Sequence, residues 1–252
     1  MYDDVFYERP FLKEVIVRID FSSSITSLKK EITPALAGKI LERFPISEPR
    51  KAFAQELQIS HDELKHKRED YTEWNYHGRN KEKRLAIAPE YMFVTYSKYE
   101  SFESLKVDFL SVLEVLFKNN ANLHGRRLGL RYVNTIELIK RDPFSWEDLI
   151  EEDLLFLFRK FRSEREFTTR LFNIVELKYE DNIQIKFQFG VPNPDFPAPI
   201  RRPFFVLDID AYFQGLIEIG LISEFLDKSH LKIQELFEQS IKDELRGIMN
   251  GE

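Results

Sequence analysis

The sequence predicts an α+β fold in which helices cover one face of antiparallel sheets. Several segments alternate apolar and polar residues with a period of two, which is typical of strands with one buried face. Two segments, Phe102–Phe117 and Leu216–Met249, carry apolar stripes at helical spacing. In each half of the chain three predicted strands follow one another as a meander, which is an antiparallel arrangement.

The first half begins with a predicted strand at Leu12–Phe21, whose apolar residues alternate. A helix is expected over Leu28–Phe44, with Pro34 in its first turn, where the missing N–H of proline costs nothing, and with Pro45 ending it. A short strand is expected at Phe53–Ile59 and a hairpin at Arg84–Ala88 with Tyr91–Tyr96. An amphipathic helix is expected at Phe102–Phe117.

Residues 60–84 differ from their surroundings because nearly all of them are charged or polar. We expect a solvated, charged hairpin or a mobile loop there. Tyr71, Trp74 and Tyr76 interrupt the charges, and with the basic run Gly78–Arg84 they could stack on single-stranded nucleic acid. Acidic residues are interleaved throughout the segment, which weighs against that interpretation.

The second half of the chain repeats the order of the first. It begins with a strand at Gly125–Leu138 and a helical stretch at Trp146–Phe158. Three strands follow, at Glu166–Tyr179, Asn182–Phe189 and Phe204–Tyr212. The last element is a long helical region at Leu216–Met249, with a break near Asp227–Ser229. Both halves thus have the order β-α-β-β-β-α. We therefore predict one domain, 1–252, that contains an internal duplication with pseudo-repeats at 11–120 and 125–249 and a long C-terminal helix.

The polar face of the predicted sheet is the candidate binding surface. On the strand at Gly125–Leu138, Leu128, Leu130 and Tyr132 alternate with the arginines. Side chains two apart on a strand lie about 7 Å apart, so such rows can form a mixed-charge platform that grips a carboxylate or a phosphate. The alternative is a face that pairs its own charges in salt bridges. The candidate binding residues are Arg127, Arg131, Asn134, Arg170, Lys186, Asp208 and Asp210.

Several kinds of chemistry find no support in the sequence. The chain has no cysteine, which excludes disulfides, thiolate nucleophiles and cysteine-ligated metals. Asp208 and Asp210 could share a Mg²⁺ ion, but the sequence identifies no third carboxylate. His61 and His66 are poorly spaced for two metal ligands, and we expect His230 to be a hydrogen-bonded core histidine. Phosphate-binding loops, nucleophile elbows and zinc-protease motifs are absent, so we predict no catalytic residue, no metal and no cofactor.

Composition narrows the class of partner. The net charge of -6 argues against a general nucleic-acid binder, no apolar segment is long enough for a membrane span, and no signal peptide is recognisable, which fits the cytoplasm. The proline-rich connection Val191–Pro203 should be stiff. It could cover a pocket, present Phe196, Arg201 and Arg202 to a partner, or simply cross the sheet edge.

Separated segments resemble the "sporadically distributed" family of uncharacterised prokaryotic proteins. The segments are Pro10–Val15, Leu128–Asn134, Leu207–Asp210 and the C-terminal helix after His230. The resemblance covers essentially the whole chain except 60–84. It implies a prokaryotic, cytoplasmic protein carried by patchily inherited genes, a distribution typical of defence and toxin–antitoxin loci, and it supplies no catalytic residues.

These observations together favour a non-enzymatic protein-interaction module with a protein partner. The many strands and aromatic residues also favour a homodimer. Two alternatives stay open. One is a small-molecule-binding or hydrolytic protein with a site built from Arg131, Asp208 and Asp210, and the other is nucleic-acid binding.

Overall fold

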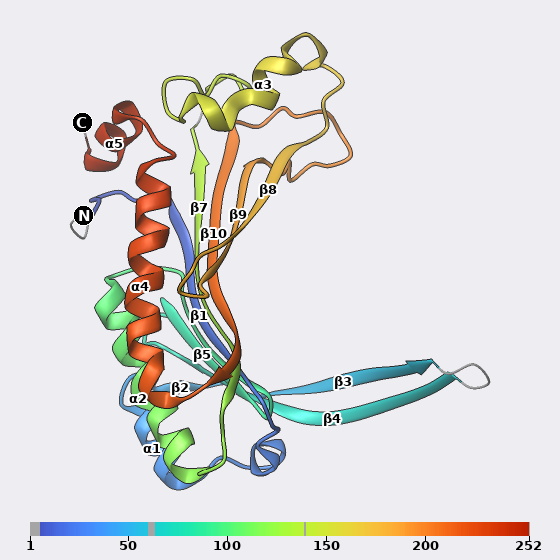
Figure 1. Cartoon of the computed structure of the whole chain (residues 1–252), viewed down its shortest axis with the longest axis vertical. Coiled ribbons are helices and arrows are strands. Elements are labelled where there is room, and N and C mark those ends of the chain that lie inside the picture. The colour runs from blue at the N-terminus through green and yellow to red at the C-terminus, as the bar shows by residue number, and fades with distance from the viewer. Residues whose placement is uncertain (1–5, 60–63, 139, 252) are drawn as a thin grey trace. The chain divides into compact units, whose positions relative to one another are not determined.

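The computed structural model describes residues 6–59, 64–138 and 140–251, with the backbone alone for 54–59 and 64–69. Its strands are β1 (Leu12–Phe21), β2 (Ile46–Ser47), β3 (Arg50–Ile59), β4 (Leu64–His77), β5 (Lys83–Ala88), β6 (Tyr91–Tyr96), β7 (Gly125–Glu137), β8 (Leu171–Lys178), β9 (Gln184–Val191) and β10 (Phe204–Ile217). Its α-helices are α1 (Pro34–Leu41), α2 (Phe102–Asn119), α3 (Phe156–Lys160), α4 (Ile219–Glu238) and α5 (Asp243–Asn250), with short 3₁₀ helices η1 (Thr26–Lys29), η2 (Glu152–Leu155) and η3 (Arg162–Glu164) (Figure 1).

The strands form a sheet of the order β2-β4-β5-β6-β1-β7-β10-β9-β8, and β3 pairs with β4 off this path. The predicted α+β class is confirmed, as are the antiparallel pairing and the C-terminal helix. Counted outward from β1 and β7, the order is β6-β5-β4 on one side and β10-β9-β8 on the other. This order is compatible with an internal duplication, which stays a prediction.

The chain divides into two compact units. Unit 1 comprises Met1–Val15, Leu130–Phe213 and Phe225–Glu252, and unit 2 comprises Ile16–Gly129 and Gln214–Glu224. Their bounds differ from those of the predicted pseudo-repeats, since β1, β7, β10 and α4 each contribute residues to both units.

The core of unit 2 is built where α1 and α2 meet the β5–β6 hairpin. Helix α2 begins at the N-cap Ser101, whose hydroxyl oxygen accepts a hydrogen bond from the Ser104 amide at 3.1 Å. Its buried stripe is formed by Leu105, Phe109, Val112, Leu113 and Leu116. Both the hairpin and this helix lie where the sequence predicts them.

Helix α1 is shorter than predicted. The expected helix at Leu28–Phe44 is divided into η1 and α1, and Pro34 occupies the first turn of α1 as expected. Because proline disfavours the helical conformation for the residue before it, the chain is extended at Thr33. The Thr33 hydroxyl then caps the helix by accepting from the Leu36 amide at 3.4 Å.

Strands β3 and β4 form a long two-stranded ribbon in unit 2. Their register runs from Arg50 opposite Glu73 to Ile59 opposite Leu64, whereas only Trp74–His77 of β4 pairs with β5. Figure 1 shows the two strands continuing together beyond β5. Strand β4 therefore occupies most of the predicted hairpin or loop at 60–84, of which 60–63 lie outside the described residues.

The core of unit 1 lies against β9 and β10. Alternate residues of β10, namely Phe205, Leu207, Ile209 and Ala211, are fully buried. Trp146 is also fully buried, and the centre of its ring lies 5.1 Å from the centre of the Phe205 ring.

Two helix predictions in the second half are wrong in their bounds. Residues Trp146–Phe158 are helical only from Glu152 onward, because the Trp146 side chain turns into the core and its indole nitrogen donates to the Pro143 carbonyl at 2.8 Å. The predicted break near Asp227–Ser229 does not occur, since α4 continues to Glu238. The helix ends later, where Ile241 pairs with Ile150 as an isolated β-bridge.

The burial of Trp146 leads to a stability prediction. Trp146→Ala should lower the free energy of unfolding by about 4 kcal/mol, because the substitution leaves a large cavity against Phe205. Phe167→Ala is the control, since Phe167 is 77% exposed and should matter little. Urea denaturation of both variants measures the difference, and equal midpoints would contradict this packing.

Candidate functional site

Arg131 and Asp208 form the centre of the polar face of unit 1. The guanidinium of Arg131 donates from Nε to Oδ1 of Asp208 at 2.7 Å and from Nη2 to Oδ2 at 2.5 Å. Two parallel bonds of this kind make a strong, oriented ion pair. The hydrogen bond to Asp208 raises the pKa of Arg131, and burial opposes this effect. The Asp208 side chain is only 7% exposed and the Arg131 side chain 42% exposed, so water reaches the arginine side of the pair.

The strands next to this pair continue the alternation of charge. Asp210 on β10 lies opposite Lys186 on β9, and Lys186 lies opposite Glu176 on β8. Opposite charges on directly facing residues stabilise a sheet modestly. The predicted mixed-charge platform is therefore present in unit 1 as geometry, and much of its charge is balanced within the sheet.

Not all predicted binding residues belong to this face. Asn134 is on the buried face of β7, where its side-chain amide nitrogen donates a hydrogen bond to the Leu207 carbonyl at 3.5 Å. Arg170 lies before β8, where Nε donates to the Pro192 carbonyl at 2.9 Å and the guanidinium stacks 4.2 Å from the Phe196 ring centre. Arg127 is on the part of β7 that belongs to unit 2. The structure thus brings together Arg131, Lys186, Asp208 and Asp210, and their role in binding stays a prediction.

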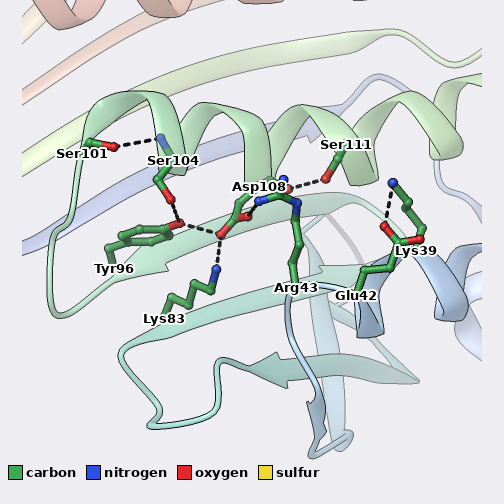
Figure 2. A network of polar contacts seen from close by, with 9 residues as sticks. All are labelled: Lys39, Glu42, Arg43, Lys83, Tyr96, Ser101, Ser104, Asp108 and Ser111. Carbon is green, nitrogen blue, oxygen red and sulfur yellow. Dashed lines mark hydrogen bonds and ion pairs between the residues drawn. The ribbon is translucent and has the colours of Figure 1, made fainter.

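A second polar cluster, which sequence reasoning missed, surrounds Asp108 on α2 in unit 2 (Figure 2). The Asp108 carboxylate is fully buried and accepts three hydrogen bonds. The donors are Arg43 Nη1 at 2.7 Å, Lys83 Nζ at 2.6 Å and the Tyr96 hydroxyl at 2.5 Å. The cluster joins the segment after α1, strand β5, the end of β6 and the middle of α2, so one carboxylate orients four segments.

This cluster contains more positive than negative charge. Two cations surround one carboxylate, and the Arg43 side chain is 38% exposed while that of Lys83 is 16% exposed. Lys83 also lies 5.0 Å from the Phe44 ring centre, which shields its ammonium group from water. A signal was present in the sequence, since Asp108 lies three residues after Leu105 and four before Val112, within the apolar stripe of α2. A charge in such a stripe needs partners.

His230 is a core histidine, as predicted. It is buried on α4, and its Nδ1 lies 3.0 Å from the Tyr132 hydroxyl. Within the described residues no group of three or more histidine, aspartate or glutamate side chains could hold a metal ion.

A cavity of about 470 Å³ lies in unit 1, beside the proline-rich connection. Its volume is within the range typical of small-molecule sites. Apolar and charged side chains both line it, and Arg165 Nη1 pairs with Asp142 Oδ2 across 3.2 Å. The lining residues are Asp142, Pro143, Phe144, Arg165, Glu166, Pro199, Ile200 and Arg201. The connection therefore borders a pocket, which is one of its three expected roles.

Comparison with known proteins gives no family and no relative: no protein-family model matches the chain, and neither does the sequence of any curated protein. The resemblance to the "sporadically distributed" family stays a prediction. Over the described residues, no helix combines the length and the apolar character that a bilayer span needs.

The Asp108 cluster predicts a large effect of one isosteric change. Asp108→Asn should lower the free energy of unfolding by about 3 kcal/mol, because Lys83 and Arg43 then lose their buried counter-ion. Glu114→Gln is the matched control, since Glu114 is exposed on the same helix. Equal unfolding midpoints for the two variants would show that the buried carboxylate is not needed.

The environment of Tyr96 leads us to predict that the free energy of unfolding falls at alkaline pH. Burial, together with the hydrogen bond to Asp108, raises the pKa of Tyr96. The folded protein keeps this phenol protonated where the unfolded chain ionises near pH 10, so stability is complete below about pH 10 and falls above it. Each such tyrosine lowers the free energy of unfolding by about 1.4 kcal/mol per pH unit above this pH, which sets the slope of stability against pH.

The slope is measured by urea denaturation at several pH values above 10. Tyr96→Phe should make it shallower without abolishing it, because burial also raises the pKa of Tyr7 and Tyr91. An unchanged slope in the variant would contradict the assignment to Tyr96.

Proposed function

We propose that the protein is a non-enzymatic interaction module of the cytoplasm, and that its ribbon β3–β4 is the surface that a partner protein contacts. The observation that carries this proposal is the pairing of the ribbon. Among the strands of the described residues, β3 has β4 as its neighbour, and β4 has β5 as a further neighbour only at Trp74–His77. A two-stranded ribbon of ten residue pairs is only marginally stable in water when nothing packs on it.

Such a ribbon offers a partner its main-chain groups. Unpaired N–H and C=O groups along a strand edge are a template for another strand, and β-augmentation is a common way in which proteins recognise extended segments. Charged residues are frequent in the part of β4 that pairs with β3. They limit non-specific pairing and favour a partner with a complementary charge pattern. Phe53, 53% exposed near the base of the ribbon, adds an apolar contact point.

The base of the ribbon is firmly attached, which suits a projecting contact element. The Trp74 indole nitrogen donates to the Leu28 carbonyl at 2.8 Å. Arg84 Nε donates to the Asn75 side-chain oxygen at 2.8 Å, and the Tyr91 hydroxyl donates to Glu73. A firmly attached base positions the ribbon before a partner binds, which lowers the entropy that binding costs.

The polar face of unit 1 gives weaker support to an enzyme. Its central arginine and aspartate already satisfy one another, and a substrate would have to displace a bidentate pair. The cavity beside the proline-rich connection favours small-molecule binding as a second candidate function, with Arg201 as a cation for an anionic ligand. The implied link to defence or toxin–antitoxin loci, like prokaryotic origin, rests on the family resemblance alone.

The test of this function is removal of the outer ribbon. In the truncated variant an Asn-Gly turn replaces residues 54–69 and joins Phe53 to Asp70, which face each other in the register. Because the described backbone of the removed residues pairs β3 with β4, the variant should keep the melting temperature of the full chain. Tagged at its natural level in the native host, the full chain should recover a stoichiometric partner that the truncated variant loses.

Arg201→Ala serves as the matched control, because it alters the cavity of unit 1 and leaves the ribbon intact. It should retain the same partner. Retention of the partner by a folded truncated variant, or recovery of no partner by the full chain, would refute the proposal. Loss of the partner in Arg201→Ala alone would instead assign the interaction to the cavity.

A further inference from the structure

Strand β8 is a long sheet edge that has a single neighbouring strand among the described residues. It ends the strand order and pairs with β9 on one side, as the last strand of the path. Its eight-residue register with β9 is continuous, so no bulge twists the edge away, and the strand contains no proline. Natural proteins usually blunt edges of this length with bulges, prolines or covering segments, because an exposed edge pairs with other chains.

The exposure of β8 rises sharply along the strand. Leu171 is 6% exposed, whereas Ile174, Val175 and Leu177 are 56%, 41% and 36% exposed. The proline-rich connection contacts the chain just before the strand, where the Ile200 amide donates to the Thr168 carbonyl at 2.9 Å and Arg170 donates to Pro192. Beyond these contacts the described residues leave an extended segment at the surface in which three exposed apolar side chains are interspersed with Glu176 and Lys178.

The hydrogen-bonding parity of β8 can be determined from its turn. The Tyr179 amide donates to the Ile183 carbonyl at 2.9 Å, in the same register as the rest of the β8–β9 pair. Hydrogen-bonded pairs alternate along an antiparallel ladder, so the odd-numbered residues of β8 bond to β9. The main-chain groups of the even-numbered residues, Phe172, Ile174, Glu176 and Lys178, therefore point to the free edge.

We propose that β8 pairs with β8 of a second copy of this chain, antiparallel, about a two-fold axis at Val175. An axis at this residue maps even-numbered positions onto even-numbered positions, so Ile174 meets Glu176 of the partner subunit and Phe172 meets Lys178 of the partner subunit. Four such pairs satisfy all the free groups of residues 172–178. An axis at Leu177 would place Ile174 opposite Glu180, which lies in the turn after β8, and would leave part of the edge unpaired.

The same register covers the exposed apolar side chains. Val175 contacts its own symmetry mate, with Leu177 diagonal to it on the same face, and Ile174 approaches its own copy diagonally on the other face. The like charges of the two Glu176 residues are offset, because each already lies opposite Lys186 of its own chain. In this one register, two copies of β8 pair their free main-chain groups and cover their exposed apolar side chains. This self-complementarity favours a second copy of the chain as the partner, and two-fold pairing of this kind is the commonest symmetry of homo-oligomers.

This surface belongs to unit 1 and does not involve the β3–β4 ribbon, so the dimer is independent of the proposed function.

Single cysteines test the register directly, because the native chain contains none. Val175 faces its symmetry mate as a non-hydrogen-bonded pair, with Cα atoms about 4.5 Å apart, which a disulfide can bridge. Val175→Cys should therefore form a covalent dimer under mild oxidation of the full-length protein. Ile174→Cys is the matched control, since position 174 lies two residues out of register with its copy, too far for a disulfide, and should stay monomeric on a non-reducing gel.

Light scattering provides the second measurement. The unmodified 30.1 kDa chain should show a mass that rises toward twice this value with concentration. Ile174→Lys should shift the protein to the monomer while keeping its melting temperature, because Ile174 is exposed in the single chain.

Four results would overturn the proposal. They are a monomeric mass at all concentrations, equal cross-linking of both cysteine variants, preferential cross-linking of Leu177→Cys, and a dimer that Ile174→Lys leaves intact.

Discussion

Main-chain hydrogen bonding in an open antiparallel sheet is the constraint on which the rest of this structure depends. Strands β5, β6, β1, β7, β10 and β9 each lie between two neighbouring strands in the order β2-β4-β5-β6-β1-β7-β10-β9-β8, which provide partners for their N–H and C=O groups. Strand β8, at one end of this order, and the β3–β4 ribbon do not have neighbours on both sides over their described lengths. Backbone groups that lack a protein partner remain solvated, and they are the groups that another chain can pair with. Both proposals about interaction follow from this one property.

Charged side chains, by contrast, form ion pairs and hydrogen bonds within each unit. In unit 2 the buried Asp108 carboxylate holds Arg43, Lys83 and Tyr96, and in unit 1 Asp208 holds Arg131. A buried ion pair costs desolvation on both sides, so its gain is in orientation more than in net stability. These interactions therefore explain how helices and strands are oriented, and on the polar face of unit 1 Arg131 and Asp208 already satisfy one another.

The parts of the fold that could be predicted are those with strict periodicity. The alternation of β7 places Leu128, Leu130 and Tyr132 in the core, and the stripe of α2 is buried as expected. The parts that could not be predicted depend on contacts between distant residues. Trp146 breaks a helical pattern because its ring fits beside Phe205.

The candidate site shows the same division. Alternation correctly assigned Arg131, Asp208 and Asp210 to a polar face, since each lies in a regular strand. It could not place Arg170, which lies in an irregular segment and is held by the proline-rich connection. Asn134 was grouped with the arginines although its even position on β7 turns it to the buried face. The partners of Asp108 come from three different segments, and no local pattern brings them together.

Hydrogen–deuterium exchange tests most directly the claim that this protein acts through strand edges. Exchange would be compared between the protein alone at low concentration and the assembly purified from the native host. We expect slower exchange in the assembly to be concentrated in peptides covering the β3–β4 ribbon and β8. Slower exchange around Arg131 and Asp208 or around the cavity at Arg201, with unchanged exchange at both edges, would contradict it.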